Sequence, residues 1–246
     1  MKRTITLIVT LCTLLTTLYA QRPYMSRAEF TKWCEDELHS DQFGSLPYRI
    51  ARFDKRTNSA PALVVWFHGG HSSGCDNKRH IGTNTDAVGK LARYLQTVED
   101  NTVLAAPHCS EQMRDESDQT AIMLCRWIDY LVEKEGIDRD KIYLIGASFG
   151  GMLVSKISSA RPDIPAAIEI IATVPHIRNA TKDDFALCCV ASDEGNLRKF
   201  DRIEQTIYQL HEAGFDIRYI VRPGLSHQEI CQVGLDKTTL DWLFSH

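Results

Sequence analysis

The stretch KIYLIGASFGG, at residues 141–151, constrains the fold of this chain more than any other part of the sequence. Its first half is a short apolar run typical of a buried strand, and a helical pattern begins just after it at Met152. Between the two lies Gly-x-Ser-x-Gly, which in this context forms a sharp strand-to-helix turn. Glycine is favoured on both sides of the serine because a Cβ atom there would crowd the turn. The pattern predicts that Ser148 is an exposed nucleophile; the alternative is a glycine-rich turn that merely contains a serine.

A second segment carries the groups that could stabilise a negative charge. Residues 62–67 form a continuous apolar run that predicts a buried strand, and the sequence HGGH follows it directly. Glycine lets a backbone N–H approach a developing oxyanion without a side chain in the way. We therefore expect an oxyanion hole made by the amide of Gly70, with Gly69 or His71 as the alternative donor. The second donor is expected to be the amide of Phe149, at the start of the helix.

A serine hydroxyl is a poor nucleophile, so it needs a nearby base and a carboxylate that orients the base. In hydrolases with this serine motif, the carboxylate and then the histidine follow the serine along the chain. The strand expected at 185–191 ends just before Asp193, which we predict to be the carboxylate, with Glu194 as the alternative. Asp193 could instead be a surface turn residue or a helix cap. The strand expected at 216–221 leads into a loop that contains His227, the predicted base.

The remaining histidines fit the role of base less well. His68 precedes the nucleophile and is expected to brace the glycine loop by hydrogen bonds. His211 falls in the middle of a predicted helix, and His246 is the last residue. His71 and His176 both follow predicted strands and are expected to line the substrate pocket.

The rest of the chain alternates between strand and helix patterns, which predicts one α/β domain over residues 21–246 with a mostly parallel sheet flanked by helices. Little room is left for a lid between Ile157 and Phe185. The formal net charge of −4 and the absence of a Lys/Arg run argue against a nucleic-acid partner. Helices are expected near 24–43, 84–97, 118–135, 197–213 and 235–244, and further strands near 46–53 (an edge strand), 102–106 and 166–173.

The N-terminus has the pattern of a secretory signal peptide. Lys2 and Arg3 precede an apolar run at 5–18, and a small residue, Ala20, stands at the expected cleavage site. The run is too short for a comfortable membrane span, so no stable membrane insertion is expected. Residues 1–20 are therefore predicted to be removed, which makes the mature protein secreted or periplasmic.

Cysteine content agrees with export. Seven cysteines follow the predicted signal peptide, at positions 34, 75, 109, 125, 188, 189 and 231. They contain no Cys-x-x-Cys pair, which argues against a zinc site. Up to three disulfides could form in an oxidising compartment. We expect one between Cys75 and Cys109, because both lie in loops after neighbouring strands; the alternative is that several cysteines are small buried apolar residues.

The motifs together resemble the α/β-hydrolase superfamily over residues 45–246. They are most similar to small secreted esterases of the polyhydroxybutyrate depolymerase and feruloyl esterase group. The resemblance is carried by the segments HGG at 68–70, GASFGG at 146–151 and PGLSH at 223–227, and by GIDRDKIY at 136–143. Ser-Phe-Gly-Gly in the second segment is also similar to the serine motif of prolyl-oligopeptidase-type peptidases.

The resemblance implies a serine esterase that acts on a small-molecule or chain-end ester through Ser148, Asp193 and His227, with no metal and no organic cofactor. A serine peptidase is the second interpretation. A non-catalytic binding protein on a hydrolase scaffold is the third.

Overall fold

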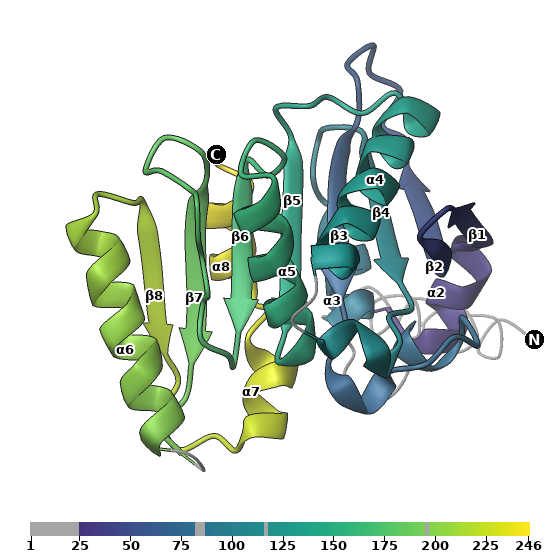
Figure 1. Cartoon of the computed structure of the whole chain (residues 1–246). Helices are drawn as coiled ribbons and strands as arrows, with labels where there is room; N and C mark the ends of the chain where they lie inside the picture. The colour runs from purple at the N-terminus through teal and green to yellow at the C-terminus, as the bar shows by residue number, and fades with distance from the viewer. Residues whose placement is uncertain (1–24, 82–86, 116–117, 195–196) are drawn as a thin grey trace, which may run out of the picture.

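The computed structural model describes residues 25–81, 87–115, 118–194 and 197–246, and in these ranges a single eight-stranded sheet forms the centre of the molecule (Figure 1). The strand order is β1-β2-β4-β3-β5-β6-β7-β8. The pairs β1–β2 and β2–β4 are antiparallel, and all the other pairs are parallel. The predicted mostly parallel sheet is thus confirmed. The strands are β1 (Glu35–Asp41), β2 (Gly44–Phe53), β3 (Ala62–Phe67), β4 (Thr102–Pro107), β5 (Ile142–Ala147), β6 (Ala167–Ile171), β7 (Ala186–Ala191) and β8 (Ile217–Val221).

Helices cover both faces of this sheet. On one face lie α4 (Asp118–Glu135), α5 (Phe149–Ala160) and α6 (Leu197–Glu212); on the other lie α2 (Arg27–Trp33), α3 (Ala87–Leu95), α7 (His227–Val233) and α8 (Lys237–Leu243) (Figure 1). Three short 3-10 helices, η1 (Gly70–Ser72), η2 (Arg79–Ile81) and η3 (Glu111–Arg114), lie in the connecting loops.

The two-sided cover explains why the central strands lack a polar face. Every residue of β3 and of β5 is buried, as expected where helices pack on both sides of a parallel sheet. Along β3, Leu63 and Val65 face the α4–α5 layer, and Val64 and Trp66 face the α3 layer. The two apolar cores hold the carboxyl ends of the parallel strands at one edge of the sheet.

The helix predicted over 24–43 is wrong in its second half. It begins as expected, with a capping box between Ser26 and Glu29, but α2 ends at Trp33 and the next residues form β1. Pairing with β2 decides this, because Asp41 and Gly44 close a tight turn between the two strands. Consequently β1, and not the strand predicted at 46–53, occupies the edge of the sheet.

The region after β8 also differs from expectation. His227 was placed in a loop, but it is the first residue of α7, and the closing helix predicted at 235–244 begins only at Lys237. The cause is a second capping box, in which the Ser226 side chain accepts from the Glu229 N–H and the Glu229 carboxylate accepts from the Ser226 N–H. This cap starts a helix where the sequence analysis expected a loop.

The structure does not show the predicted disulfide. The N–H of Gly74 donates to the carbonyl of Cys109 over 3.1 Å, so the two loops are indeed neighbours. However, Cys75 is exposed and Cys109 is buried, and all seven cysteines in the described ranges are free thiols. The Cys75–Cys109 pairing therefore stays a prediction.

The predicted signal peptide, residues 1–20, lies outside the described residues. Within the part of the chain that the structure describes, no helix has both the length and the apolar character that a membrane crossing requires.

Candidate active site

The residues singled out by the sequence analysis gather where the parallel strands end. Ser148 follows β5, the HGGH segment follows β3, Asp193 follows β7, and His227 follows β8. Because these strands run parallel in one sheet, the turns after them lie at the same edge. Open α/β sheets bind their ligands at this edge.

Ser148 occupies the sharp turn predicted for it. Its backbone angles are φ 53° and ψ −110°, a strained conformation for a residue with a side chain. A Cβ added at Gly146 would overlap the backbone of Gly150, and one added at Gly150 would overlap the carbonyl of Phe67. The N–H of Ser148 donates to the carbonyl of Ile171 over 2.8 Å. Close backbone packing on both sides therefore fixes the direction of the serine.

His227 lies beside this serine. Its Nε2 is 2.9 Å from the Ser148 Oγ, although the two residues are 79 positions apart in the chain. With Nδ1 protonated and Nε2 unprotonated, the hydroxyl donates to the ring, which is the arrangement a general base requires. Ser148 and His227 thus meet as the sequence analysis expected.

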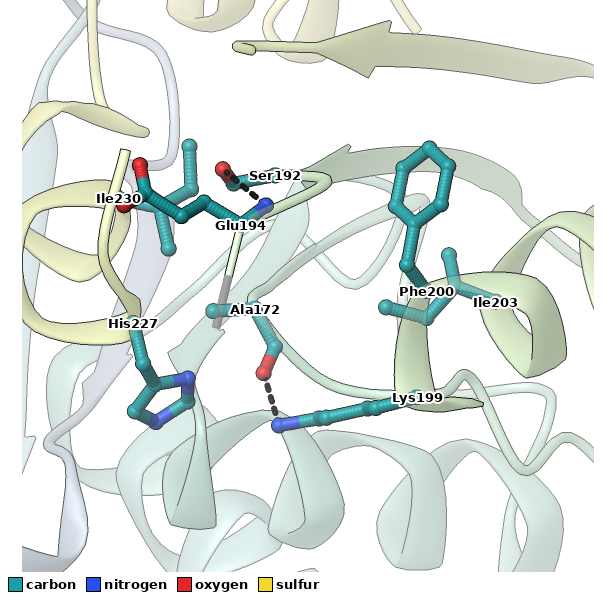
Figure 2. A pocket seen from close by; sticks show the side chains of 8 residues that line it. All are labelled: Ala172, Ser192, Glu194, Lys199, Phe200, Ile203, His227 and Ile230. Atoms are coloured by element: carbon teal, nitrogen blue, oxygen red, sulfur yellow. Dashed lines mark hydrogen bonds between the residues drawn. The ribbon is translucent and has the colours of Figure 1, made fainter. Parts of the chain in front are cut away.

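The surroundings of His227 favour its neutral form. Burial lowers the pKa of His227 below its usual value, and the positive charges of Lys199 and His71 lower it further. The side chain of Lys199 extends from α6 into the cavity that His227 also lines, and its Nζ hydrogen-bonds to the carbonyl of Ala172 (Figure 2). A neutral imidazole can accept the serine proton at neutral pH.

The two candidate carboxylates contact the loop that leads to His227, and in the described residues neither hydrogen-bonds to the imidazole. Asp193 Oδ1 accepts from the N–H of Gly224 over 2.8 Å. The preceding residue, Ser192, donates from Oγ to the carbonyl of Leu225 over 2.6 Å. These two hydrogen bonds therefore connect the turn after β7 to the turn after β8. Asp193 as the triad acid, with Glu194 as the alternative, stays a prediction.

The predicted oxyanion donors stand at the starts of two helices. Gly70 and His71 begin η1, and Phe149 begins α5, so their N–H groups precede the first residue that can donate within its own helix. A Cβ at Gly69 would lie 3.7 Å from the carbonyl of Ala147, which places the glycine loop directly against the serine turn.

A cation lies beside these donors that the sequence analysis missed. The guanidinium of Arg114 lies 4.5 Å from the centre of the Phe149 ring, and a Cβ at Gly70 would overlap it. Glu111, in the same 3-10 helix, forms an ion pair with this guanidinium.

Two cavities are lined by His227, and one of them is also lined by Ser148. The larger, of about 340 Å³, is lined by apolar side chains of Phe200, Ile203 and Ile230 together with Lys199 and Glu194 (Figure 2). The smaller, of about 80 Å³, lies between the glycine loop and α7 and is bounded by both Ser148 and His227. Both cavities therefore adjoin the imidazole, and the smaller one also adjoins the reacting hydroxyl.

The two histidines predicted to line the pocket have different positions. His71 lines the smaller cavity, as expected. His176 lines neither of the two cavities, because its backbone is held against α5: its N–H donates to Ser155 Oγ, and its carbonyl accepts from Ser159 Oγ. Residues 172–185, which contain His176, form neither helix nor strand.

Metal ligation was also considered. No group of three or more His, Cys, Asp or Glu side chains in the described ranges is arranged to hold a metal ion.

The chain is similar to one protein family, to two curated sequences and to solved structures. Residues 113–228 match the prolyl oligopeptidase family, and this range includes Ser148, Asp193 and His227. A candidate esterase named NocK, from Nocardia uniformis subsp. tsuyamanensis, is 30% identical over 112 residues, which are 45% of this chain and 32% of that protein. Feruloyl esterase B of Talaromyces funiculosus is 22% identical over 141 residues, which are 55% of this chain and 40% of that protein.

The chain thus spans less than half the length of either curated relative. Among solved structures, one described as a thermostable esterase has a TM-score of 0.74 and 20% sequence identity, covering 87% of this chain and 63% of that chain. At this level of identity the likeness establishes a shared fold.

Proposed function

We propose that this protein, which has the α/β-hydrolase fold, is a serine hydrolase that cleaves carboxylic esters through an acyl-enzyme intermediate. The observation that carries the proposal is the 2.9 Å contact between His227 Nε2 and the oxygen of Ser148, on a strained turn that faces the amides of Gly70 and Phe149. Similarity to relatives described as esterases supports the choice of ester over amide.

The reaction follows from the groups present. Ser148 Oγ attacks the ester carbonyl while His227 Nε2 takes its proton, and the amides of Gly70 and Phe149 stabilise the tetrahedral oxyanion. When the intermediate collapses, His227 gives the proton to the leaving alcohol. A water molecule then attacks the acyl-enzyme while His227 takes a proton from it. His227 returns this proton to Ser148 Oγ as the acid product leaves. We assign two roles to Asp193: it stabilises the charged imidazole, and it supports the loop before His227.

The shape of the site supports a soluble or chain-end ester as substrate. The connection between β6 and β7 contains no helix that could form a lid, and the larger cavity joins an apolar wall to a lysine and a glutamate. We further propose export through residues 1–20, on the sequence pattern alone.

Purified protein tests the reaction class when p-nitrophenyl acetate and butyrate are compared with peptide p-nitroanilides. We expect ester turnover that Ser148→Ala lowers by at least about 1,000-fold, as loss of a nucleophile does. Ser45→Ala is the matched control, since Ser45 is an exposed serine in the β1–β2 hairpin.

A serine peptidase is the second candidate, supported by the match to the prolyl oligopeptidase family. Anilide cleavage without ester turnover would favour it. Absence of both activities in folded protein would contradict the proposal and leave the binding-protein interpretation.

A further inference from the structure

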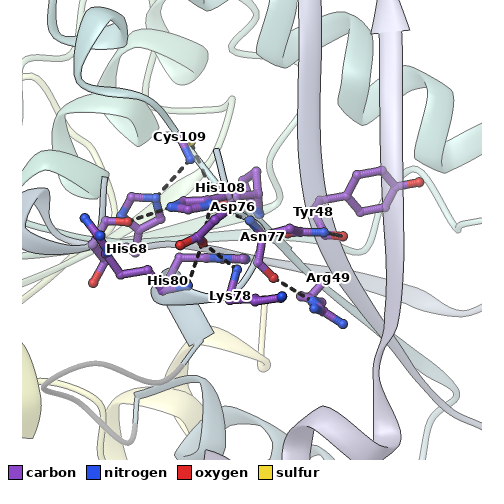
Figure 3. Close-up of polar contacts among 12 residues, drawn as sticks. Tyr48, Arg49, His68, Asp76, Asn77, Lys78, His80, His108 and Cys109 are labelled. Carbon is purple, nitrogen blue, oxygen red and sulfur yellow. Dashed lines mark hydrogen bonds and ion pairs between the residues drawn. The ribbon is translucent and has the colours of Figure 1, made fainter. Parts of the chain in front are cut away.

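Three buried imidazoles lie directly behind the glycine loop of the oxyanion hole (Figure 3). His68 follows β3, His108 follows β4, and His80 lies in η2, and all three are less than 5% exposed. The rings of His80 and His108 stack with centroids 4.5 Å apart, and His68 is 5.6 Å from His108. The sequence analysis expected only His68 to brace the loop.

The hydrogen bonds define which nitrogen of His68 and of His108 carries the proton. The Asn77 N–H donates to His108 Nδ1 over 2.9 Å, whereas Asp76 Oδ1 is farther from this nitrogen, at 3.4 Å, and accepts from two backbone N–H groups. The proton of a neutral ring is therefore on Nε2, 2.9 Å from the Ser72 carbonyl. The Cys109 N–H donates to His68 Nε2 over 3.0 Å, so its proton is on Nδ1, 2.8 Å from the Gly69 carbonyl. Both rings therefore donate to carbonyls of the glycine loop.

These carbonyls control the oxyanion donors through the geometry of the peptide group. In a trans peptide the C=O and the following N–H point in opposite directions. His68, by holding the Gly69 carbonyl, therefore fixes the direction of the Gly70 N–H. His108, by holding the Ser72 carbonyl, fixes the Ser73 N–H, which donates to the Gly70 carbonyl over 3.0 Å. The Gly70 carbonyl in turn fixes the N–H of His71.

The Asn77 side of the network anchors His108 to the sheet. Asn77 has φ 52° and is buried, and its Nδ2 donates to the carbonyl of Tyr48 over 2.8 Å. Its own carbonyl accepts from Arg49 Nε over 2.8 Å. Strand β2 is thereby connected through Asn77 to His108 (Figure 3). The other ring nitrogen of His108 contacts Ser72, the last residue of η1.

We propose that His108 is a positioning residue for the oxyanion hole: as the Nε2–H tautomer, with Nδ1 occupied by the Asn77 amide, it holds the Ser72–Ser73 peptide, and through the hydrogen bond from Ser73 to Gly70 it fixes η1, the turn that carries the N–H groups of Gly70 and His71. This inference rests on the proposed function, since it concerns the step in which negative charge develops. A displacement of about 1 Å at a reacting centre can cost about 100-fold in rate. We therefore expect a loss in kcat without a matching change in KM.

The kinetic test compares His108→Leu, which removes the donor, with His108→Gln, whose amide can replace the Nε2–H. We expect His108→Leu to lower kcat by about 10- to 100-fold, with KM within about twofold, and His108→Gln to recover most of the loss. Val103→Ala, in the buried centre of β4, is the control for lost stability and should keep the kcat of wild-type protein. Wild-type kcat in His108→Leu, or no recovery in His108→Gln, overturns the proposal.

A second measurement needs no variant. Nitrogen shifts of the imidazoles, measured by NMR on wild-type protein, should identify His108 as neutral with its proton on Nε2. A proton on Nδ1, or a charged ring at neutral pH, overturns the proposal even if His108→Leu does not fold. If wild-type protein cleaves no ester, the proposed function fails, and this NMR result still decides the tautomer on which the positioning role depends.

Discussion

The contact between Ser148 and His227 depends on the charge state of a single ring. A protonated imidazole cannot accept the serine proton, so the reaction requires neutral His227. Burial and the nearby Lys199 both disfavour the charged ring. Burial is the larger cause of the lowered pKa of His227, and Lys199, a residue of another helix that no local motif marks, adds to it.

The pH dependence of kcat/KM tests this arrangement. Because the pKa of His227 is lowered from its ordinary value of about 6.5, activity should persist below that pH and fall as the pH drops through the lowered pKa. Lys199→Met removes a positive charge, which raises the pKa of His227 and moves the acid limb to higher pH. Lys237→Met, on exposed α8, should leave the limb unchanged. A limb that stays in place or moves to lower pH in Lys199→Met would contradict this account.

The role of Asp193 can be separated into charge and loop support. Asn at this position can still accept from the Gly224 N–H but carries no charge, whereas Ala has neither the acceptor nor the charge. If Asp193 is the triad acid, we expect both variants to lose at least about 100-fold in kcat, as loss of a triad carboxylate does. Glu194→Gln should stay within about threefold of wild type. Near-normal kcat in Asp193→Asn would show that Asp193 supports the loop and is not the triad acid.

At the scale of elements, the strand-to-helix turn is held by backbone packing. The first turn of α5 lies so close to the end of β3 that Gly150 contacts the carbonyl of Phe67, whereas a Cβ at Gly151 would mainly meet the side chains of Thr173 and Ile170. Side chains can shift by changing rotamer, but a strand carbonyl cannot shift without breaking its sheet.

This difference predicts unequal costs for two adjacent substitutions. We expect Gly150→Ala to lower the free energy of unfolding by about 3 kcal/mol or more and Gly151→Ala by about 1 kcal/mol, because only the first overlaps backbone. Urea unfolding followed by circular dichroism measures both. Equal costs for the two variants would show that the turn is not packed as described.

Local sequence patterns predicted an element well where its backbone geometry and the chemistry of the site require the same residue types. The turn at Ser148 is such a case, since glycine, serine and the flanking apolar runs all indicate one geometry. The helix expected over 24–43 rested on the spacing of Phe30, Trp33, Cys34 and Leu38, which fits a helix. The prediction failed because Trp33 and Leu38 are more than half exposed and pairing with β2 decides the structure. The start of α7 was readable from Ser226 and Glu229, a capping box that was overlooked.

At the scale of the whole molecule, the sheet encloses a carboxyl group that forms no ion pair in the part of the chain that the structure describes. Glu169, in the middle of β6, is fully buried on the face covered by α8, and burial raises its pKa to about 8. Asp236 raises this pKa slightly, and Thr239 opposes the shift. Between its unfolded pKa near 4.5 and the folded value, Glu169 holds a proton that the unfolded chain lacks. Stability must therefore fall as the pH rises through this window.

Glu169→Gln should flatten this dependence, because an amide stays neutral at every pH. We expect the free energy of unfolding of wild-type protein to fall more between pH 6 and pH 8.5 than that of Glu169→Gln. Glu212→Gln, at the exposed end of α6, is the matched control. Parallel pH curves for wild type and Glu169→Gln would refute a protonated buried carboxyl.

Contacts that depend on the assembled sheet could not be read from the sequence. His108 meets Asn77 and Ser72 only because β4 lies between β2 and β3. Lys199 and His227 line one cavity only because α6 and α7 begin at the same edge of the sheet, after β7 and β8. The serine and the base were predictable, because each follows a strand in a recurrent chain order. Their supporting side chains follow no such order.

The central claim is that Ser148 is a nucleophile activated by His227. Labelling with a fluorophosphonate probe, followed by mass spectrometry of the peptides, measures this directly. We predict one phosphonylated residue, Ser148, with no label on Ser148→Ala and labelling of His227→Ala slowed by at least about 100-fold. Stable, folded wild-type protein that takes up no label, or that is labelled equally fast without the imidazole, would contradict the claim.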